Sequence, residues 1–249
     1  MLEKGREYPA AITLPISSDP GALGHAVTWI AGQDRELGGV PLLYAPAKRN
    51  LEYDPGVSRV AKAMAVATWR TLGSLQWGGG VVLALWPDRE HLGAISDNRR
   101  TRGLCVIPDD DQEAAPWATA TKAVCLGAEA APAAEPAGTG RLARLDPVVV
   151  QGLLTLTMLV NHGNNLAGTA DHRDAVAVLL TLHDGGHALP ADQVYEWALV
   201  NGWPSRGADR LTELAGKIAT GTRPRLKGPW PLRDGILETW RSEASQNAR

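Results

Sequence analysis

The chain of 249 residues contains no phenylalanine, although it contains nine tryptophans. Indole rings must therefore carry out the aromatic packing that benzyl rings usually share with them. The tryptophans are scattered along the chain, so the sequence shows no single aromatic platform for stacking. We expect most of them to be core residues whose indole N–H finds an acceptor at the edge of the core.

Cysteine is also scarce, with only Cys105 and Cys125 in the whole chain. These two residues lack the C-x-x-C spacing of zinc sites, and a single pair of thiols does not make a disulfide framework. Both lie in short apolar runs, which we expect to be buried strands.

The chain lacks an apolar run long enough to span a bilayer, and its first ten residues lack the apolar core of a signal peptide. We therefore expect a cytoplasmic protein with reduced thiols and no membrane contact. The formal net charge of −2 argues against a globally basic protein that coats nucleic acid. A local basic patch remains compatible with this charge, because phosphate binding depends on clustering on one face.

Residues 1–127 alternate between short apolar runs and helical patterns, which predicts an α/β domain with a mainly parallel sheet. The expected strands are residues 11–16, 40–45, 81–86, 103–107 and 123–126. The expected helices are residues 22–31, 56–72, 89–95 and 112–122. Right-handed crossovers are the default connections in such a sheet.

Residues 128–140 are rich in Ala, Pro, Glu and Gly, and we expect a solvated linker there. After it the strand pattern disappears, so residues 141–249 are predicted to form an all-α domain. Its first helix, residues 146–161, has Pro147 behind a capping Asp146 and apolar residues around most of its circumference, which predicts a central, buried helix. The remaining predicted helices are residues 174–182, 191–200, 205–219 and 234–243.

Charged residues follow three of the predicted strands, where ligands usually bind in open α/β sheets, and Asp88 and Arg89 are the charges after residues 81–86. Lys48 and Arg49 follow one strand, and Asp109, Asp110 and Asp111 follow another. Clustered carboxylates suit Mg²⁺, and the two cations suit a phosphate. The structural alternative is that Asp111 caps the next helix. We predict no dedicated metal site, because three adjacent side chains cannot all point at one ion.

The sequence lacks the glycine motifs that bind nucleotides, GxxxxGK[ST] and GxGxxG. The triplet Gly78, Gly79 and Gly80 precedes a predicted strand, whereas a phosphate-binding loop follows a strand and opens a helix. We interpret the triplet as a turn into the strand. No cofactor is therefore predicted.

A group of polar residues follows the first helix of the second domain. His162 and His172, with Asp171 or Asp174, have the composition of a metal or acid/base site. The structural alternative is helix termination by Gly and Asn, followed by a new helix that Asp171 caps. We favour this alternative, because Asn is a poor metal ligand.

The last third of the chain reads as three amphipathic helices followed by a basic run. The short connection at residues 201–204 suits a helix-turn-helix corner, with Ser205 as the N-cap of the third helix. Asp209 and Glu213 share the outer face of that helix and are spaced to pair with its cations, as on an ordinary surface helix. In the nucleic-acid interpretation, the first two cations face base edges and the later ones neutralise phosphates. These candidates are Arg206, Arg210, Lys217, Arg223, Arg225 and Lys227.

The sequence thus favours a non-catalytic regulatory or accessory protein whose C-terminal helical domain contacts DNA or a protein partner. One alternative is an Mg²⁺-dependent enzyme that handles phosphoesters or nucleotides at the strand ends. Another is a protein-interaction module of a larger assembly.

Overall fold

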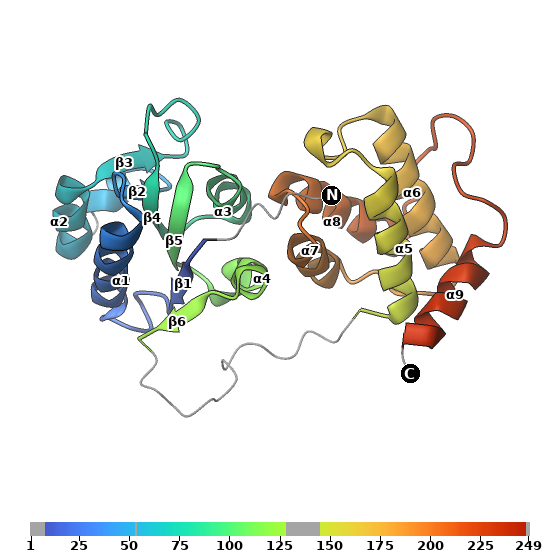
Figure 1. Ribbon diagram of the computed structural model, residues 1–249, viewed down its shortest axis with the longest axis horizontal. Helices are drawn as coiled ribbons and strands as arrows, with labels where there is room; N and C mark the ends of the chain where they lie inside the picture. Colours follow the sequence, from blue (N-terminus) through green and yellow to red (C-terminus); the bar gives the residue numbers. More distant parts are fainter. Residues whose placement is uncertain (1–7, 53, 128–144, 248–249) are drawn as a thin grey trace. The chain divides into compact units, whose positions relative to one another are not determined.

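The computed structural model describes residues 8–52, 54–127 and 145–247 (Figure 1). The described residues divide into two compact units, one within residues 3–140 and the other within residues 141–249. The first unit is an α/β fold and the second is helical, which confirms the predicted fold class. The linker predicted at residues 128–140 lies outside the described residues.

The α/β unit is built on a parallel sheet of six strands in the order β3-β2-β4-β5-β1-β6. Residues such as Leu42, Leu43 and Val82 have almost no exposed surface, because both faces of the sheet are covered. The strands are β1 (Ala10–Thr13), β2 (Leu42–Ala45), β3 (Ala65–Thr68), β4 (Gly80–Leu85), β5 (Thr101–Ile107) and β6 (Val124–Leu126).

Helices cover the two faces of this sheet in pairs (Figure 1). On one face, α1 (Ala22–Leu37) and α2 (Pro55–Ala63) pack with one set of alternating strand residues. On the other face, α3 (Arg89–Ser96) and α4 (Asp111–Thr121) pack with the other set. Because side chains alternate across a strand, Leu42 and Leu43 of β2 enter different cores.

The connections after the neighbouring strands β2 and β4 run in opposite directions. The chain leaves β2 towards β3 at one edge of the sheet, and it leaves β4 in the opposite direction towards β5. In open α/β folds, ligands usually bind beyond the carboxyl ends of strands at such a switch point. The short 3₁₀ helix η1 (Lys48–Glu52) follows β2 at this place.

Two predictions for the α/β unit were wrong. Residues 56–72 do not form one helix, because α2 ends at Ala63 and residues 65–68 are the edge strand β3. Cys125 is exposed, because it lies on the short edge strand β6. Cys105 is buried as predicted, and burial raises the pKa of its thiol to about 12.

The helical unit contains five α-helices in its described part. They are α5 (Pro147–Leu159), α6 (Thr169–Asp184), α7 (Ala191–Val200), α8 (Ser205–Ala219) and α9 (Ile236–Asn247). Two tryptophans fix the unit around α5, because Trp203 donates its indole N–H to Thr157 and Trp240 donates to Thr155, each at 2.9 Å. Both indoles are buried, as their role as anchors requires.

Helix α5 is not buried all round, contrary to its predicted character. Val149, Leu153 and Leu156 are fully buried, but Leu154 is 39% exposed and Met158 is 79% exposed. The sequence pattern showed that the helix is apolar on most sides, but it could not show that one side would lack a covering element in this unit.

Candidate functional site

The predicted cations at the start of α8 differ in their surroundings. Arg206 is exposed to solvent. Arg210 is half-buried, and its guanidinium donates from Nη1 to the backbone carbonyl of Asn165 at 2.8 Å. Arg210 therefore helps to hold the loop before α6 against α8, and only Arg206 of this pair presents its charge to solvent without such a contact.

Two further candidates form ion pairs on the surface. The Nζ of Lys217 lies 2.6 Å from Glu213, and this contact lowers the pKa of that fully exposed carboxyl. The Nη2 of Arg223 lies 2.6 Å from Asp184. Both pairs are exposed, so each contributes little to stability, and a phosphate could replace the carboxylate at small cost.

The structure does not gather all six candidate cations into one cluster. Arg206 stands in the first turn of α8, whereas Arg223 follows the other end of this 15-residue helix, which corresponds to an axial separation of more than about 20 Å. The remaining candidates, Arg225 and Lys227, follow Arg223 in the chain after α8.

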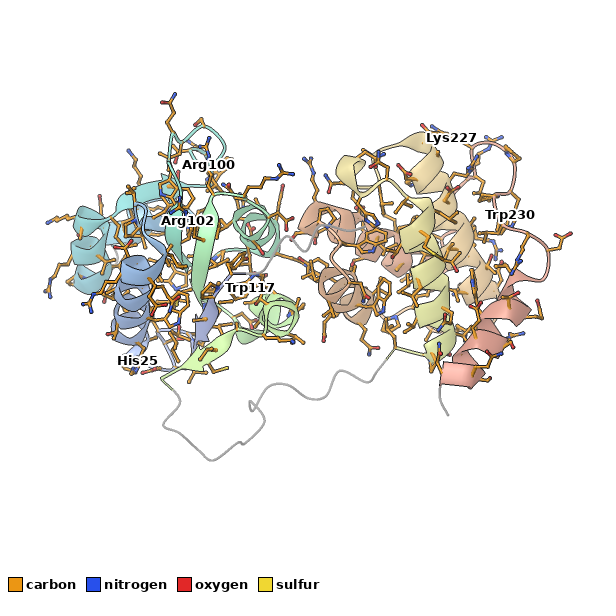
Figure 2. All side chains as sticks on the ribbon, in the orientation of Figure 1. His25, Arg100, Arg102, Trp117, Lys227 and Trp230 are labelled. Carbon is orange, nitrogen blue, oxygen red and sulfur yellow. The ribbon has the colours of Figure 1, made fainter. Side chains whose placement is uncertain are left out.

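The later cations belong to a basic segment, residues 223–233, that joins α8 to α9 (Figure 2). It contains four exposed cations and no acidic residue, and Trp230 within it is 49% exposed. The cations are Arg223, Arg225, Lys227 and Arg233. Sequence reasoning missed Arg233 and Trp230, although the absence of any acid before Asp234 is a signal that could have included them.

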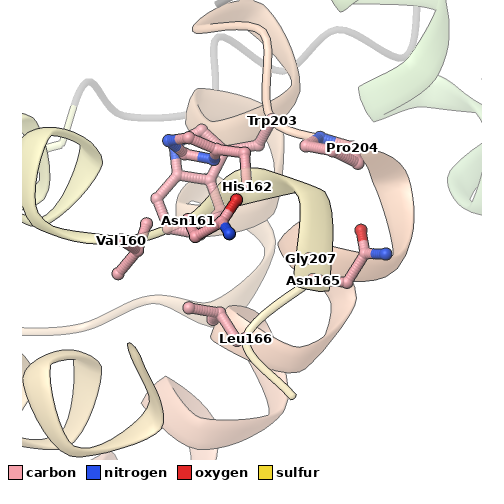
Figure 3. A pocket seen from close by; sticks show the side chains of 8 residues that line it. All are labelled: Val160, Asn161, His162, Asn165, Leu166, Trp203, Pro204 and Gly207. Carbon is pink, nitrogen blue, oxygen red and sulfur yellow. The ribbon is translucent and has the colours of Figure 1, made fainter. Parts of the chain in front are cut away.

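The turn between α7 and α8 has the features of a fixed corner. Gly202 adopts a φ of +81° at the end of α7, which favours glycine at this position. The next residue, Trp203, packs edge-to-face on His162 with ring centroids 4.6 Å apart. These side chains line a shallow depression at the start of α8, together with Asn161, Asn165 and Gly207 (Figure 3).

The polar residues around the start of α6 make hydrogen bonds within the unit. Asp171 does not cap α6, because this helix begins at Thr169 and Asp171 lies in its first turn. There it is buried and accepts hydrogen bonds from the Asn161 amide and the Asn164 side chain. Within the described residues, no group of three or more His, Cys, Asp or Glu side chains is placed to hold a metal ion.

The strand-end candidates of the α/β unit lie at two separate strands. Lys48 and Arg49 are exposed in η1, beyond β2 at the switch point. Asp109 and Asp110 are exposed beyond β5, and β4 lies between these two strands. Asp111 begins α4, and its side chain is outside the described part of the structure.

Asp88, which the sequence identified as a charge after a strand, is paired with His91, which the sequence did not indicate. Asp88 accepts a hydrogen bond from the His91 amide at the start of α3, and its Oδ1 lies 2.6 Å from Nδ1 of the same histidine. The His91 ring stacks on Tyr44 of β2, with ring centroids 5.9 Å apart. Burial, and secondarily the charge of Asp88, raise the pKa of the Tyr44 hydroxyl. Tyr44 therefore stays protonated at neutral pH.

Comparison with known proteins bears on the helical unit alone. Residues 145–241 match the model of a family described as a domain of unknown function, DUF1889. The matched range runs from the residue before Asp146 into α9, so the DUF1889-like region comprises most of the helical unit. No curated protein and no solved structure matches the chain.

The beginning of the DUF1889-like region is held by one carboxylate. Asp146 caps α5 by accepting from the Val148 amide at 2.8 Å, and it also lies 2.7 Å from Nδ1 of His187 in the loop between α6 and α7. Partial burial favours a higher pKa for Asp146, but the hydrogen bonds from His187 and Val148 outweigh it and hold the pKa below its usual value. The ionised residue thus links the start of α5 to the loop between α6 and α7.

The described helices carry no candidate membrane span, because none of them combines the necessary length with sufficient apolar character.

Proposed function

We propose that the protein is a non-catalytic regulatory or accessory protein whose helical unit contacts duplex DNA through the basic segment, residues 223–233. The observation that carries this proposal is the run of four exposed cations in a segment that contains no acid, beside the exposed Trp230. One of the four, Arg223, is paired on the surface with Asp184 of α6. Cations that cluster on one surface release counterions from a phosphate backbone, and this release supplies most of sequence-independent DNA affinity.

The basic segment supports this proposal better than the outer face of α8 does. On α8, Lys217 is paired with Glu213 and Arg210 is bound to a backbone carbonyl. In the basic segment, Arg225 and Lys227 are exposed, and no ion pair joins either of them to an acid in the described part of the chain. Arg206 then adds a separate phosphate or base contact from the helix-turn-helix-like corner formed by α7 and α8.

The test is the salt dependence of binding to a fluorescently labelled duplex, measured by anisotropy. If all four cations contact phosphates, the logarithm of the association constant falls against the logarithm of salt concentration with a slope of about −3.6. In the double variant Arg225→Ala with Lys227→Ala, the slope becomes smaller by about 2, because two phosphate contacts are lost.

A matched control removes two cations elsewhere. Arg59 and Lys62 are exposed on α2 of the α/β unit, so Arg59→Ala with Lys62→Ala changes the net charge by the same amount. We expect this control to retain the wild-type slope. Equal losses in both double variants would show a general charge effect, and no binding at low salt would reject the proposal.

A second candidate function is favoured by the place of Lys48 and Arg49 beyond β2 at the switch point. The α/β unit would then be an enzyme that handles phosphoesters or nucleotides with Mg²⁺. A bound nucleotide raises the unfolding temperature by mass action, and Lys48→Ala with Arg49→Ala removes this increase. An unchanged unfolding temperature across nucleotides with and without Mg²⁺ would reject this candidate.

We also propose that the protein acts in the cytoplasm. Both cysteines are free thiols, and one of them, Cys125, is exposed. An exposed free thiol is typical of proteins in reducing compartments. Fractionation of cells that express a tagged chain tests this location, and recovery outside the cytoplasmic fraction would contradict it.

A further inference from the structure

The helical unit contains a groove that is not lined by residues of the basic segment. It lies between α5 and α7 and has a volume of about 530 Å³. Its wall on α5 includes Pro147, Val150 and Leu154, and its wall on α7 includes Trp197 and Val200. The lining is therefore largely apolar, as in the grooves that accept an amphipathic helix.

The groove continues along an exposed apolar stripe of α5. Val150, Leu154 and Met158 follow one another at intervals of four residues, so they lie on one face of the helix. On α7, Val200 is 58% exposed, and on α5 Met158 is 79% exposed. Single exposed apolar residues are common, but a contiguous stripe beside a groove marks an interaction surface.

One polar atom in the groove indicates the charge of its occupant. Glu196 lines the groove on its α7 wall, and its Oε2 is buried without a hydrogen-bond partner among the described residues. Burial raises the pKa of this carboxyl. An unpaired carboxylate is costly in such surroundings, and a cation brought by a partner offsets that cost.

We propose that this groove binds the apolar face of one amphipathic helix from a partner protein, and that a lysine or arginine of that helix pairs with Glu196. The apolar walls of the groove contact the apolar stripe of the partner helix, and the unpaired carboxylate of Glu196 binds the cation of that helix. Helix α5 has 13 residues, which corresponds to about 20 Å and therefore to three or four turns of a helix lying along it. The partner helix then presents anchors at i, i+3 or i+4, and i+7.

A labelled synthetic helix serves as the probe for the full-length chain. It carries leucines at every third or fourth position and one lysine within the stripe, and a second version has norleucine in place of this lysine. We expect the lysine version to bind about tenfold more tightly than the norleucine version. In Glu196→Gln, this preference disappears, which a double-mutant cycle quantifies.

Two double variants distinguish binding in the groove from nonspecific hydrophobic binding of the probe. Leu154→Gln with Val200→Gln makes the groove polar, and we expect it to weaken binding of the probe at least about tenfold. Val40→Gln with Val124→Gln is the control, because Val40 and Val124 are 52% and 58% exposed in the α/β unit. Circular dichroism confirms that each variant is folded.

The outcomes decide between occupants. Loss of binding in the groove variant but not in the control, together with the lysine preference, supports a basic amphipathic helix. Equal binding by wild type and groove variant overturns the proposal, and so does equal affinity for the two probes. If no probe binds and size-exclusion chromatography shows a dimer that the groove variant dissociates, the occupant is a second copy and the partner-helix proposal is wrong.

Discussion

Tryptophan takes several structural positions that phenylalanine could not fill in this chain. The indole N–H of Trp117 donates to Ser96 at 3.2 Å, and that of Trp77 donates to the Val40 carbonyl at 2.6 Å. Together with Trp203 and Trp240, these residues join distant segments by both packing and a directed hydrogen bond. The expectation that most tryptophans anchor the core through a satisfied N–H therefore holds for these four, whereas Trp69 and Trp230 are exposed.

Trp240 allows a direct test of this role. Trp240→Ala removes a buried indole and leaves the Thr155 hydroxyl without its donor, so we expect the free energy of unfolding to fall by about 3–5 kcal/mol. Trp230→Ala, at a position that is 49% exposed, is the matched control and should change it by less than about 0.5 kcal/mol. Urea unfolding followed by circular dichroism measures both. Similar losses in the two variants would contradict the assigned burial.

Asp146 predicts a dependence of stability on pH. Its pKa is lowered in the folded protein, so its ionised form stabilises the fold above the pKa of the unfolded chain, and this contribution is lost as the pH falls through the folded pKa. Asp146→Asn should therefore cost up to about 1 kcal/mol of free energy of unfolding at pH near 7, because asparagine can still cap α5 but has no charge to pair with His187. The difference from wild type should shrink below about pH 4. Urea unfolding at both pH values measures it, and a constant difference would argue against the ionised cap.

At the scale of elements, α5 and α6 approach closely at a glycine. A Cβ atom on Gly152 of α5 would lie 2.8 Å from Cδ1 of Leu182 on α6, whereas a Cβ on Gly32 of α1 would meet nothing within 4 Å. Gly152→Ala should therefore lower the free energy of unfolding by about 1–3 kcal/mol, because the helices must move apart. Gly32→Ala should raise it by about 0.5–1 kcal/mol through helix propensity. Chemical denaturation distinguishes the two, and the same sign in both would refute the packing argument.

Elements with a strong period or clear caps were predictable. The helices beginning at Pro147 and Ser205 start within a residue or two of their predicted positions, because proline and the turn residues mark their ends. Asp146 caps the first helix as predicted, but Ser205 is not the cap of the second, because it is the first residue of α8 and Pro204 precedes it as the N-cap. Strand β3 was not predictable, because its Ala-Val-Ala-Thr sequence also fits a continuation of the preceding helix. Only its pairing with β2 makes it a strand. The exposure of Cys125 has a similar cause, because the sequence does not show which strand lies at the edge.

The candidate sites were less predictable than the elements, because they depend on contacts between distant segments. The cations of α8 and the basic segment could be named from sequence, but not the contact that holds Arg210 to Asn165. The pairing of Asp146 with His187 joins residues that are 41 positions apart. Glu196 reads as an ordinary surface acid until its position between α5 and α7 is known.

At the scale of the whole molecule, the two compact units predict two unfolding steps. Leu83→Ala removes a fully buried side chain from β4 of the α/β unit, and we expect it to cost about 2–5 kcal/mol in that unit. Calorimetry of the full-length chain should show that Leu83→Ala lowers one transition and that Trp240→Ala lowers another. A single transition that both substitutions move equally would show that the units unfold together.

The order of the strands in the sheet also determines when each strand can find its pairing partners during synthesis. The first strand, β1, pairs with β5 and β6 rather than with the next strand in the chain. It must therefore wait for partners that are about 90 residues further on, which a ribosome needs roughly 5–20 s to add. During that interval β2, β3 and β4 can pair with one another, while the apolar Ala10–Thr13 strand stays open to other contacts. A nascent chain stalled before Ile107 is thus the form most exposed to chaperones and to aggregation.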